Sequence, residues 1–186
     1  MLIILDRDGV INHDSTDYIK SPKEWMAIPG SLEAIAALNK AGHQVVVATN
    51  QSGVGRGYFS LDTLDAIHQK MEKELAAVGG ELAGIYSCLH HPDEGCECRK
   101  PKPGLLKQIE KDFGVDITQA LVVGDSLRDI EAAQAAGCIA VLVETGKPIP
   151  SPLPLKMQKV PIFSNLAQVV EGVLGDASLG NFSRSH

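Results

Sequence analysis

The chain has 186 residues, a length that favours a single domain with at most a modest insertion, since domains average about 150 residues. Apolar residues make up 44% and charged residues 22%, which provides for a buried core and excludes wholesale disorder. Lysine and arginine total 17 against 23 acidic residues, for a net charge of −6, and aromatic residues are only 4%. This balance argues against a nucleic-acid partner, because such proteins neutralise phosphates with cations and stack bases on aromatic rings.

The sequence offers no segment suited to a membrane. Its longest purely aliphatic runs, Ala34–Leu38 and Ile139–Val143, are five residues long, whereas a membrane-spanning helix needs about 20. Asp6 also interrupts the apolar N-terminus before the apolar stretch of a secretory signal could form. We therefore expect a cytoplasmic protein without a membrane partner. The lack of a long exposed apolar stretch favours a monomer.

Short apolar runs alternate with helical patterns along the chain. The first run, Leu2–Leu5, has the all-apolar character of a strand buried on both faces. The pattern over 31–41 predicts a helix that Ser31 caps and Gly42 ends. The remaining expected elements are strand Val45–Ala48, helix 61–78, a weak strand Ile85–Ser87, helix 104–113, strand Leu121–Val123, helix 127–136, strand Ile139–Val143, a strand near 160–163 and a helix near 165–174.

This alternation of strands and helices predicts right-handed βαβ units and a parallel sheet with helices on both faces. The expected fold is a Rossmann-like three-layer α/β/α sandwich, formed by a single domain over residues 1–174. Residues 147–161 contain five prolines and predict an extended surface connector. Residues 175–186 have little to bury and predict a flexible C-terminal tail.

Polar residues directly follow the apolar runs, at the edge where a parallel sheet places its ligand site. Asp6-Arg7-Asp8-Gly9 follows the first run, Thr49-Asn50-Gln51-Ser52-Gly53 the second, and Gly124-Asp125-Ser126 the fourth, while Arg99-Lys100-Pro101 precedes the helix at 104. Each segment on its own could be an ordinary turn or a helix cap. Because all of them occupy the same position relative to a strand or helix, the sequence predicts that they meet at one edge of the sheet.

This mixture of carboxylates, a hydroxyl, an amide and cations suits phosphoryl transfer. Three carboxylates near one point repel one another and need a cation, and hard oxygen ligands with room for water favour Mg²⁺. One carboxylate can attack phosphorus to form an aspartyl-phosphate. A carboxylate two residues further on points to the same side of an extended chain. It can therefore protonate the leaving oxygen and later deprotonate water.

From residue 2 to about 147, these segments resemble, in order, the four motifs of the haloacid-dehalogenase-like phosphohydrolases, abbreviated HAD. The resemblance implies Asp6 as the nucleophile and Asp8 as the general acid and base. It further implies two stabilisers of the transferring group, Thr49 and Lys100, and three magnesium ligands, which are Asp6, the backbone carbonyl of Asp8, and Asp125. Asp129 matches a second acid in the last motif. We expect it either behind the site or as a solvated helix residue.

No segment between the motifs is long enough for a large cap domain, so a capless, open site is expected for substrates larger than a bare phosphate ester. Arg99, next to Lys100, has the planar donor fork to bind a sugar or a second phosphate. Arg56 and Arg128 are either further substrate contacts or ordinary surface charge. The other expected substrate contacts are Asp14, Ser15, Thr16 and Asp17 of the first loop, and Asn50, Gln51 and Ser52.

Three of the four cysteines and two histidines lie within residues 88–98, which predicts a metal site in a reducing compartment. Three thiolates and one imidazole satisfy tetrahedral Zn²⁺ with no open position, as in a structural site. Zinc would stabilise a loop that lacks an apolar core and would set the following Arg99 and Lys100 in place. The alternative is three free thiols. The expected ligands are Cys88, Cys96, Cys98 and one of the two histidines. The resemblance favours His90 over His91 as the fourth ligand. The remaining cysteine, Cys138, is expected in the core.

The zinc loop narrows the resemblance to two groups of phosphatases, which act on a heptose bisphosphate and on histidinol phosphate. The compact chain and the continuation Lys102-Pro103-Gly104 favour the heptose group. That group removes the 7-phosphate of D-glycero-D-manno-heptose 1,7-bisphosphate in lipopolysaccharide core biosynthesis. The short spacing between His90 and Cys96 favours the histidinol group instead. Alternatives of other classes are a non-catalytic zinc-loop interaction module and a phosphotransferase such as a mutase.

Overall fold

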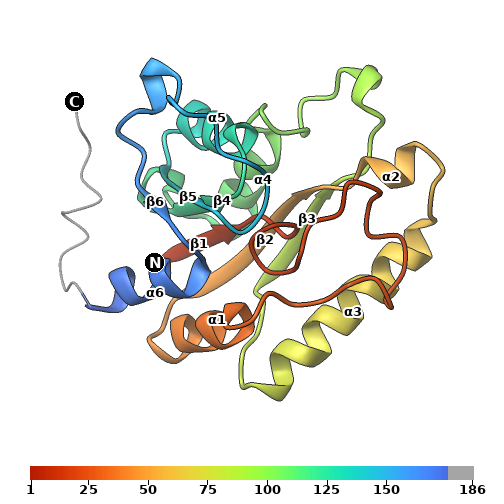
Figure 1. Ribbon diagram of the computed structural model, residues 1–186, viewed down its shortest axis with the longest axis horizontal. Helices are drawn as coiled ribbons and strands as arrows, with labels where there is room; N and C mark the ends of the chain where they lie inside the picture. The colour runs from red at the N-terminus through yellow and green to blue at the C-terminus, as the bar shows by residue number, and fades with distance from the viewer. Residues whose placement is uncertain (176–186) are drawn as a thin grey trace.

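The computed structural model describes residues 1–175 as three layers, with a six-stranded sheet between two groups of helices (Figure 1). The strand order is β3-β2-β1-β4-β5-β6, and every neighbouring pair is parallel. The α/β/α sandwich expected from the sequence is therefore confirmed. Within residues 1–175, no helix has both the length and the apolar character needed to cross a lipid bilayer.

The elements follow the expected alternation along the chain. The strands are β1 (Leu2–Leu5), β2 (Gln44–Asn50), β3 (Gly84–Cys88), β4 (Leu121–Gly124), β5 (Ile139–Val143) and β6 (Ile162–Phe163). The α-helices are α1 (Ser31–Lys40), α2 (Ser52–Gly55), α3 (Leu61–Ala77), α4 (Gly104–Phe113), α5 (Leu127–Ala136) and α6 (Leu166–Gly175). The described residues also form three short 3-10 helices, η1 (Pro92–Glu94), η2 (Ile117–Gln119) and η3 (Leu155–Met157).

The central strands are apolar throughout because both faces of the sheet are covered. Ile3 and Leu5 pack with residues of α1, α3 and α6, which lie below the sheet in Figure 1. Leu2 and Ile4 point to the opposite face and pack with α4 and α5. Each fully buried aliphatic side chain contributes roughly 1.5–3 kcal/mol, so these two cores hold the strand ends in register.

Two local expectations are wrong because tertiary contacts override the local pattern. Ser31 does not cap α1: the N-cap is Gly30 at φ 85°, and the buried Ser31 hydroxyl donates to the Val10 carbonyl at 2.9 Å. The second strand does not end at residue 48, because Thr49 and Asn50 continue β2 by pairing with β3. The short helix α2 directly after that strand was not expected.

The proline-rich segment 147–161 is not purely an extended surface connector. It contains η3, and the fully buried Met157 packs against Ile130 and Leu142. Of the flexible tail expected over 175–186, Gly175 ends α6, and residues 176–186 lie outside the described part of the chain.

Candidate active site and metal centre

The site lies at the carboxyl ends of β1, β2 and β4, where the order of the strands reverses. The chain runs from β1 outward to β2 and β3, and then returns to place β4 on the other side of β1. This switch point is where parallel α/β sheets bind ligands, because the flanking loops separate there. Asp6 follows β1 directly, and its N–H donates to the Val123 carbonyl at 3.0 Å. The predicted convergence of the polar segments at one edge is confirmed.

Lys100 lies buried between two carboxylates. Its Nζ is 3.1 Å from Asp6 Oδ1 and 2.6 Å from Asp129 Oδ1, and it donates to the Ala48 carbonyl at 2.8 Å. Burial opposes the charged form of Lys100, but Asp129 and Asp6 outweigh it and raise the pKa of the ammonium. Burial also raises the pKa of Asp6 to about 7, although Lys100 counteracts this. The site thus holds more negative charge than one lysine balances.

Asp129 belongs to this buried group and is not a solvated helix residue. It is 2% exposed, and its Oδ2 accepts hydrogen bonds from the Ser126 N–H at 3.0 Å and the Ser126 hydroxyl at 2.8 Å. Burial disfavours the ionised form, but Lys100 and Ser126 prevail and lower the pKa of Asp129. Asp129 therefore caps the start of α5 and also fixes Lys100.

The residues around Asp125 fit a divalent cation. One oxygen each of Asp6, Asp125 and Asp129 lie within 4.8 Å of one another. Asp125 Oδ2 accepts from the Lys147 N–H at 2.9 Å, whereas its buried Oδ1 has no hydrogen-bond partner within residues 1–175. Burial and the nearby Asp129 raise the pKa of Asp125, so a bound cation would relieve an unfavourable concentration of charge. The donor set is all oxygen, which suits Mg²⁺.

Asp8 is held ionised by hydrogen-bond donors from three residues. Arg7 donates to Asp8 Oδ1 from Nε at 3.0 Å and from Nη2 at 2.9 Å. Asn12 Nδ2 donates at 2.8 Å and Gln51 Nε2 at 2.9 Å. Burial opposes ionisation, but Arg7, Asn12 and Gln51 together lower the pKa of Asp8. The carboxylate is therefore oriented as well as charged.

The segment after β2 connects the other catalytic candidates. Gln51 Nε2 donates to the buried Thr49 hydroxyl at 2.9 Å, in addition to its contacts with Asp8 and Arg7. The Asn50 amide bonds both backbone groups of Lys100, donating to the carbonyl at 3.0 Å and accepting from the N–H at 3.1 Å. Both amides, expected to contact substrate, thus already hold other residues of the site.

A cavity of about 550 Å³ opens over these groups. Asp14, Ser15 and Thr16 line it, but Asp17 does not and pairs with Lys20 instead. The other expected residues that line it are Asp6, Asp8, Asn50, Gln51, Ser52, Arg99 and Lys100. The remaining lining residues, which the sequence left open or did not indicate, are Tyr18, Ile19, Arg56, Ser126, Arg128, Asp129, Gly146, Lys147 and Pro148. Lys147 had a usable signal, because Glu144-Thr145-Gly146-Lys147 directly follows the apolar run of β5.

The loop that follows β5, residues 144–148, packs so closely against the site that position 146 has room only for glycine. A Cβ at Gly146 would lie 2.0 Å from Asp125 Oδ2. Lys147 Nζ is 3.2 Å from Asp14 Oδ2, so the loop joins the carboxylate after β4 to the loop after β1. The Thr145 hydroxyl adds a hydrogen bond to the Gly9 carbonyl at 2.7 Å.

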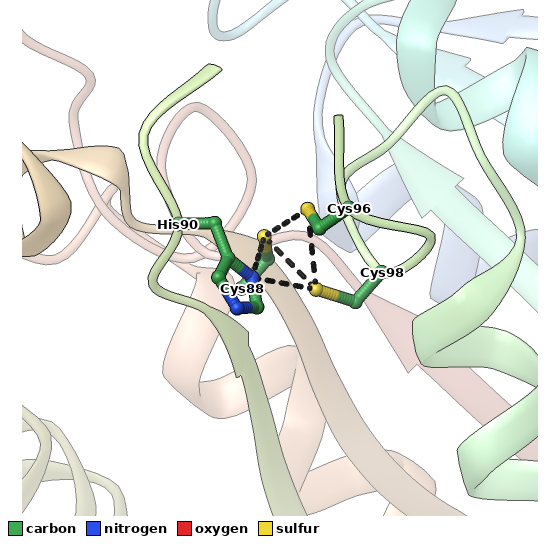
Figure 2. Close-up of side chains that lie close together, drawn as sticks. All are labelled: Cys88, His90, Cys96 and Cys98. Atoms are coloured by element: carbon green, nitrogen blue, oxygen red, sulfur yellow. Dashed lines mark hydrogen bonds between the residues drawn. The ribbon is translucent and has the colours of Figure 1, made fainter. Parts of the chain in front are cut away.

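Three cysteines and one histidine form a compact cluster at the end of β3 (Figure 2). His90 Nδ1 is 3.1 Å from Cys98 Sγ, and the three sulfur atoms lie 3.2 to 3.6 Å apart. Such spacings approach the edges of a zinc tetrahedron, which measure about 3.8 Å for Zn–S bonds of about 2.3 Å. His91 is not part of this cluster. Its Nδ1 instead accepts a hydrogen bond from the Asp93 N–H and caps η1.

The cysteine–histidine cluster leads directly into the cations of the site. Cys98 is followed by Arg99, whose side chain lines the cavity and whose buried Nη1 has no hydrogen-bond partner in the described part of the chain. The Gly104 N–H donates to the Glu97 carbonyl at 3.1 Å, which closes the loop onto the start of α4. The cluster is thus continuous in the chain with Arg99 and Lys100, two cations that line the cavity.

Comparisons with known proteins agree with this geometry. A family model described as HAD-hydrolase-like matches residues 97–169. D-glycero-beta-D-manno-heptose-1,7-bisphosphate 7-phosphatase of Pseudomonas aeruginosa is 52% identical over 176 residues, covering 93% of this chain and 97% of the relative. The enzyme of the same name from Bordetella bronchiseptica is 56% identical over 145 residues, covering 78% and 81%. The crystal structure of D,D-heptose 1,7-bisphosphate phosphatase from B. bronchiseptica, complexed with magnesium and phosphate, matches with a TM-score of 0.87 and 48% identity over 95% of this chain and 99% of that one.

The fold and the site together define a HAD-like hydrolase, in which aspartates after β1 and β4 meet a lysine at the switch point of a parallel sheet. Similarity to the P. aeruginosa relative is high and extends over nearly its full length. The chain therefore belongs to the family of D-glycero-beta-D-manno-heptose-1,7-bisphosphate 7-phosphatases.

Proposed function

We propose that this chain removes the 7-phosphate of D-glycero-D-manno-heptose 1,7-bisphosphate, as a step in making the activated heptose of lipopolysaccharide core. The observation that carries the chemistry is the buried group of Asp6, Lys100 and Asp129 beside the unpartnered oxygen of Asp125. The choice of substrate draws on the names of the relatives that cover most of the chain.

In the first half of the reaction, Asp6 attacks phosphorus and the bond between phosphorus and the sugar oxygen breaks. Asp8, in its protonated form, gives its proton to that oxygen, so that an alcohol leaves instead of an alkoxide. The substrate phosphate brings negative charge next to Asp8, which favours the protonated form needed for this step. Lys100 and Thr49 stabilise the charge on the transferring group.

In the second half, Asp8 takes a proton from water while the water oxygen attacks phosphorus. The bond to Asp6 then breaks, phosphate is released, and the starting protonation state returns. Mg²⁺, when held by Asp6, Asp125 and the Asp8 backbone carbonyl, would neutralise the buried carboxylates and the phosphate oxygens. The hydrogen bonds to Asp8 keep its carboxylate aimed in both halves.

Substrate selection is assigned to the wall of the cavity away from Asp6. The free Nη1 of Arg99 suits the second phosphate or a sugar hydroxyl, because a guanidinium gives two parallel donors to a phosphate. Asp14, Ser15 and Thr16, which also line the cavity, supply acceptors for sugar hydroxyls. The cavity is open, so the sugar and its second phosphate need not be enclosed.

Zinc is assigned to Cys88, His90, Cys96 and Cys98 as a structural ion. Four protein ligands leave no open position, so zinc acts on catalysis only by holding Arg99 and Lys100 in place. Thiolates of this kind persist in a reducing compartment, which supports a cytoplasmic location.

Specificity constants on two substrates test the assignment. For the purified Mg²⁺-loaded enzyme, we expect kcat/KM for the heptose bisphosphate to exceed that for histidinol phosphate by at least about 100-fold, since a site built for a second phosphate leaves its cations unpaired with an amine. A preference for histidinol phosphate would overturn the substrate assignment. It would favour a histidinol-phosphate phosphatase, the alternative that the short spacing from His90 to Cys96 indicates.

Removing the nucleophile tests the chemistry. Asp6→Asn should abolish turnover while still binding inorganic phosphate, because the amide is isosteric but does not attack phosphorus. Asp62→Asn, at an exposed position in the first turn of α3, serves as the matched control and should retain full activity. Unchanged hydrolysis by Asp6→Asn would contradict the nucleophile assignment.

A further inference from the structure

Arg7 has a fully buried side chain, so every donor of its guanidinium needs an acceptor within the protein. Nε and Nη2 bond the Asp8 carboxylate, and Nη2 also reaches Gln51 Oε1 at 3.2 Å. Nη1 turns away from Asp8 and lies 3.2 Å from His68 Nε2. His68 lies 61 residues further along the chain than Arg7, in α3 and outside the four motifs.

The direction of this hydrogen bond fixes the chemical form of His68. A guanidinium only donates, so His68 Nε2 must accept and the ring must be neutral with its proton on Nδ1. The side chain of His68 is nearly buried, and burial together with the charge of Arg7 lowers its pKa to about 4. The neutral ring is therefore the form present near pH 7.

We propose that His68 is a positioning residue that orients the acid and base Asp8 through Arg7. This inference rests on the proposed function, in which Asp8 protonates the leaving oxygen. Asp8 can turn about its side-chain bonds, and the Arg7 guanidinium restricts that rotation through two donors to one oxygen, in addition to the single donors of Asn12 and Gln51. A guanidinium that is bonded to Asp8 on one side and to His68 on the other resists tilting. Without a partner at Nη1, the guanidinium can rotate, and the Asp8 carboxylate bonded to it rotates as well. Misplacement of a reacting group by about 1 Å can cost about 100-fold in rate.

The proposal predicts an effect that depends on the leaving group. A sugar alkoxide is a poor leaving group and needs the proton of Asp8, whereas p-nitrophenolate leaves without one. Because kcat/KM reports the steps up to leaving-group departure, it separates the two cases. For His68→Leu, we expect kcat/KM to fall about tenfold with the heptose bisphosphate and less than about twofold with p-nitrophenyl phosphate.

A conservative variant and a matched control make the test specific. His68→Gln keeps an acceptor on a side chain of similar reach, so it should restore kcat/KM with the heptose bisphosphate to within about threefold of the parent. Ile67→Val removes one buried methyl from the neighbouring position of α3, at a cost of about 1 kcal/mol, and keeps the Arg7 contact. It should leave both specificity constants unchanged.

Several outcomes would overturn the proposal. If kcat/KM of His68→Leu falls equally with both substrates, His68 has a merely structural role. If kcat/KM with the heptose bisphosphate is unchanged, His68 has no role in the reaction. If His68→Leu does not fold, His68→Asn is the replacement, because it is polar but too short to reach Arg7, and the same selective loss is expected. Asp8→Asn tests separately the proposed function on which this inference rests. If kcat/KM with the heptose bisphosphate is unchanged in Asp8→Asn, Asp8 is not the acid and base.

Discussion

At the scale of single residues, Lys100 decides whether the site is stable without metal. It is the cation that contacts both Asp6 and Asp129, and all three side chains are withdrawn from water. Removing one partner of a buried ion pair costs about 3–5 kcal/mol, because the remaining charges stay buried without compensation. An exposed pair such as Lys102 with Glu97 is worth far less.

Lys100→Met should lower the free energy of unfolding by about 3 kcal/mol in Mg²⁺-free buffer at pH 7.5, and it should also abolish turnover. Lys102→Met, two residues away, should change stability by less than about 0.5 kcal/mol. Urea denaturation of the three proteins measures the difference. Equal stability of the two variants would mean that Lys100 is not balancing the buried carboxylates.

His68 should make the fold sensitive to mild acid. Its pKa falls from the ordinary 6.5 to about 4 on folding, because of burial and the nearby Arg7. Above pH 6.5 the ring is neutral in both states and contributes no pH dependence. Between pH 6.5 and 4 the unfolded chain binds a proton that the folded chain does not, so the free energy of unfolding decreases as pH falls, by on the order of 3 kcal/mol in total.

Urea denaturation at several pH values checks this dependence against His68→Gln, which lacks a titrating group at position 68 and keeps all the others. The decrease from pH 6.5 to 5 should be smaller in the variant than in the parent. Parallel curves for the two proteins would contradict the pKa of His68 in the folded state.

At the scale of elements, the segment between β3 and α4 carries the cysteine–histidine cluster and ends at Arg99 and Lys100. Its single 3-10 turn, η1, buries no residue, so little apolar packing holds this loop. A bound zinc ion would replace that missing core, since metal binding energy becomes folding energy in such loops. The position of Lys100 would then depend on a metal that never touches the substrate.

Cys96→Ser should therefore lose one equivalent of zinc and lower kcat by about tenfold, because Arg99 and Lys100 lose their anchor. Cys138→Ser is the matched control, since Cys138 is also a free thiol but lies outside the cluster. It should keep its zinc and its activity. Atomic emission measures the metal content, and full zinc occupancy in Cys96→Ser would contradict the ligand set.

At the scale of the whole molecule, cations gather at the cavity although the chain as a whole is acidic. The net charge is −6. Among the described residues, the cavity is nevertheless lined by four cations beyond Lys100, namely Arg56, Arg99, Arg128 and Lys147, alongside the carboxylates Asp6, Asp8, Asp14 and Asp129. Concentrated positive charge in a concave site attracts anions and raises the rate of association, and salt screens this attraction. A substrate with two phosphates should feel it more than a substrate with one.

Raising the salt from 50 to 500 mM should lower kcat/KM for the heptose bisphosphate by a few fold, and by less for p-nitrophenyl phosphate. Arg128→Gln should weaken this salt dependence. Lys156→Gln removes an exposed charge that lies outside the cavity lining and should leave the dependence unchanged. Identical salt slopes for the parent and Arg128→Gln would exclude Arg128 from the attraction.

The sequence by itself determined the layers of the fold and the edge that carries the site. Strands buried on both faces must be short apolar runs, and the polar residues that follow them, such as Asp6 and Asp125, meet because parallel strands end together. The cysteine–histidine cluster was also readable, because its residues lie close together in the chain and metal ligation restricts their types.

Only the tertiary structure decided which polar groups are buried together. The sequence left open whether Asp129 lies behind the site or is a solvated helix residue, and its burial against Lys100 depends on how α5 meets the start of α4. The contact of Arg7 with His68 joins two elements across 61 residues, and no local pattern records such a distance. Local preferences fix elements through neighbouring residues, whereas the orientation and protonation of a site depend on groups that only packing brings together.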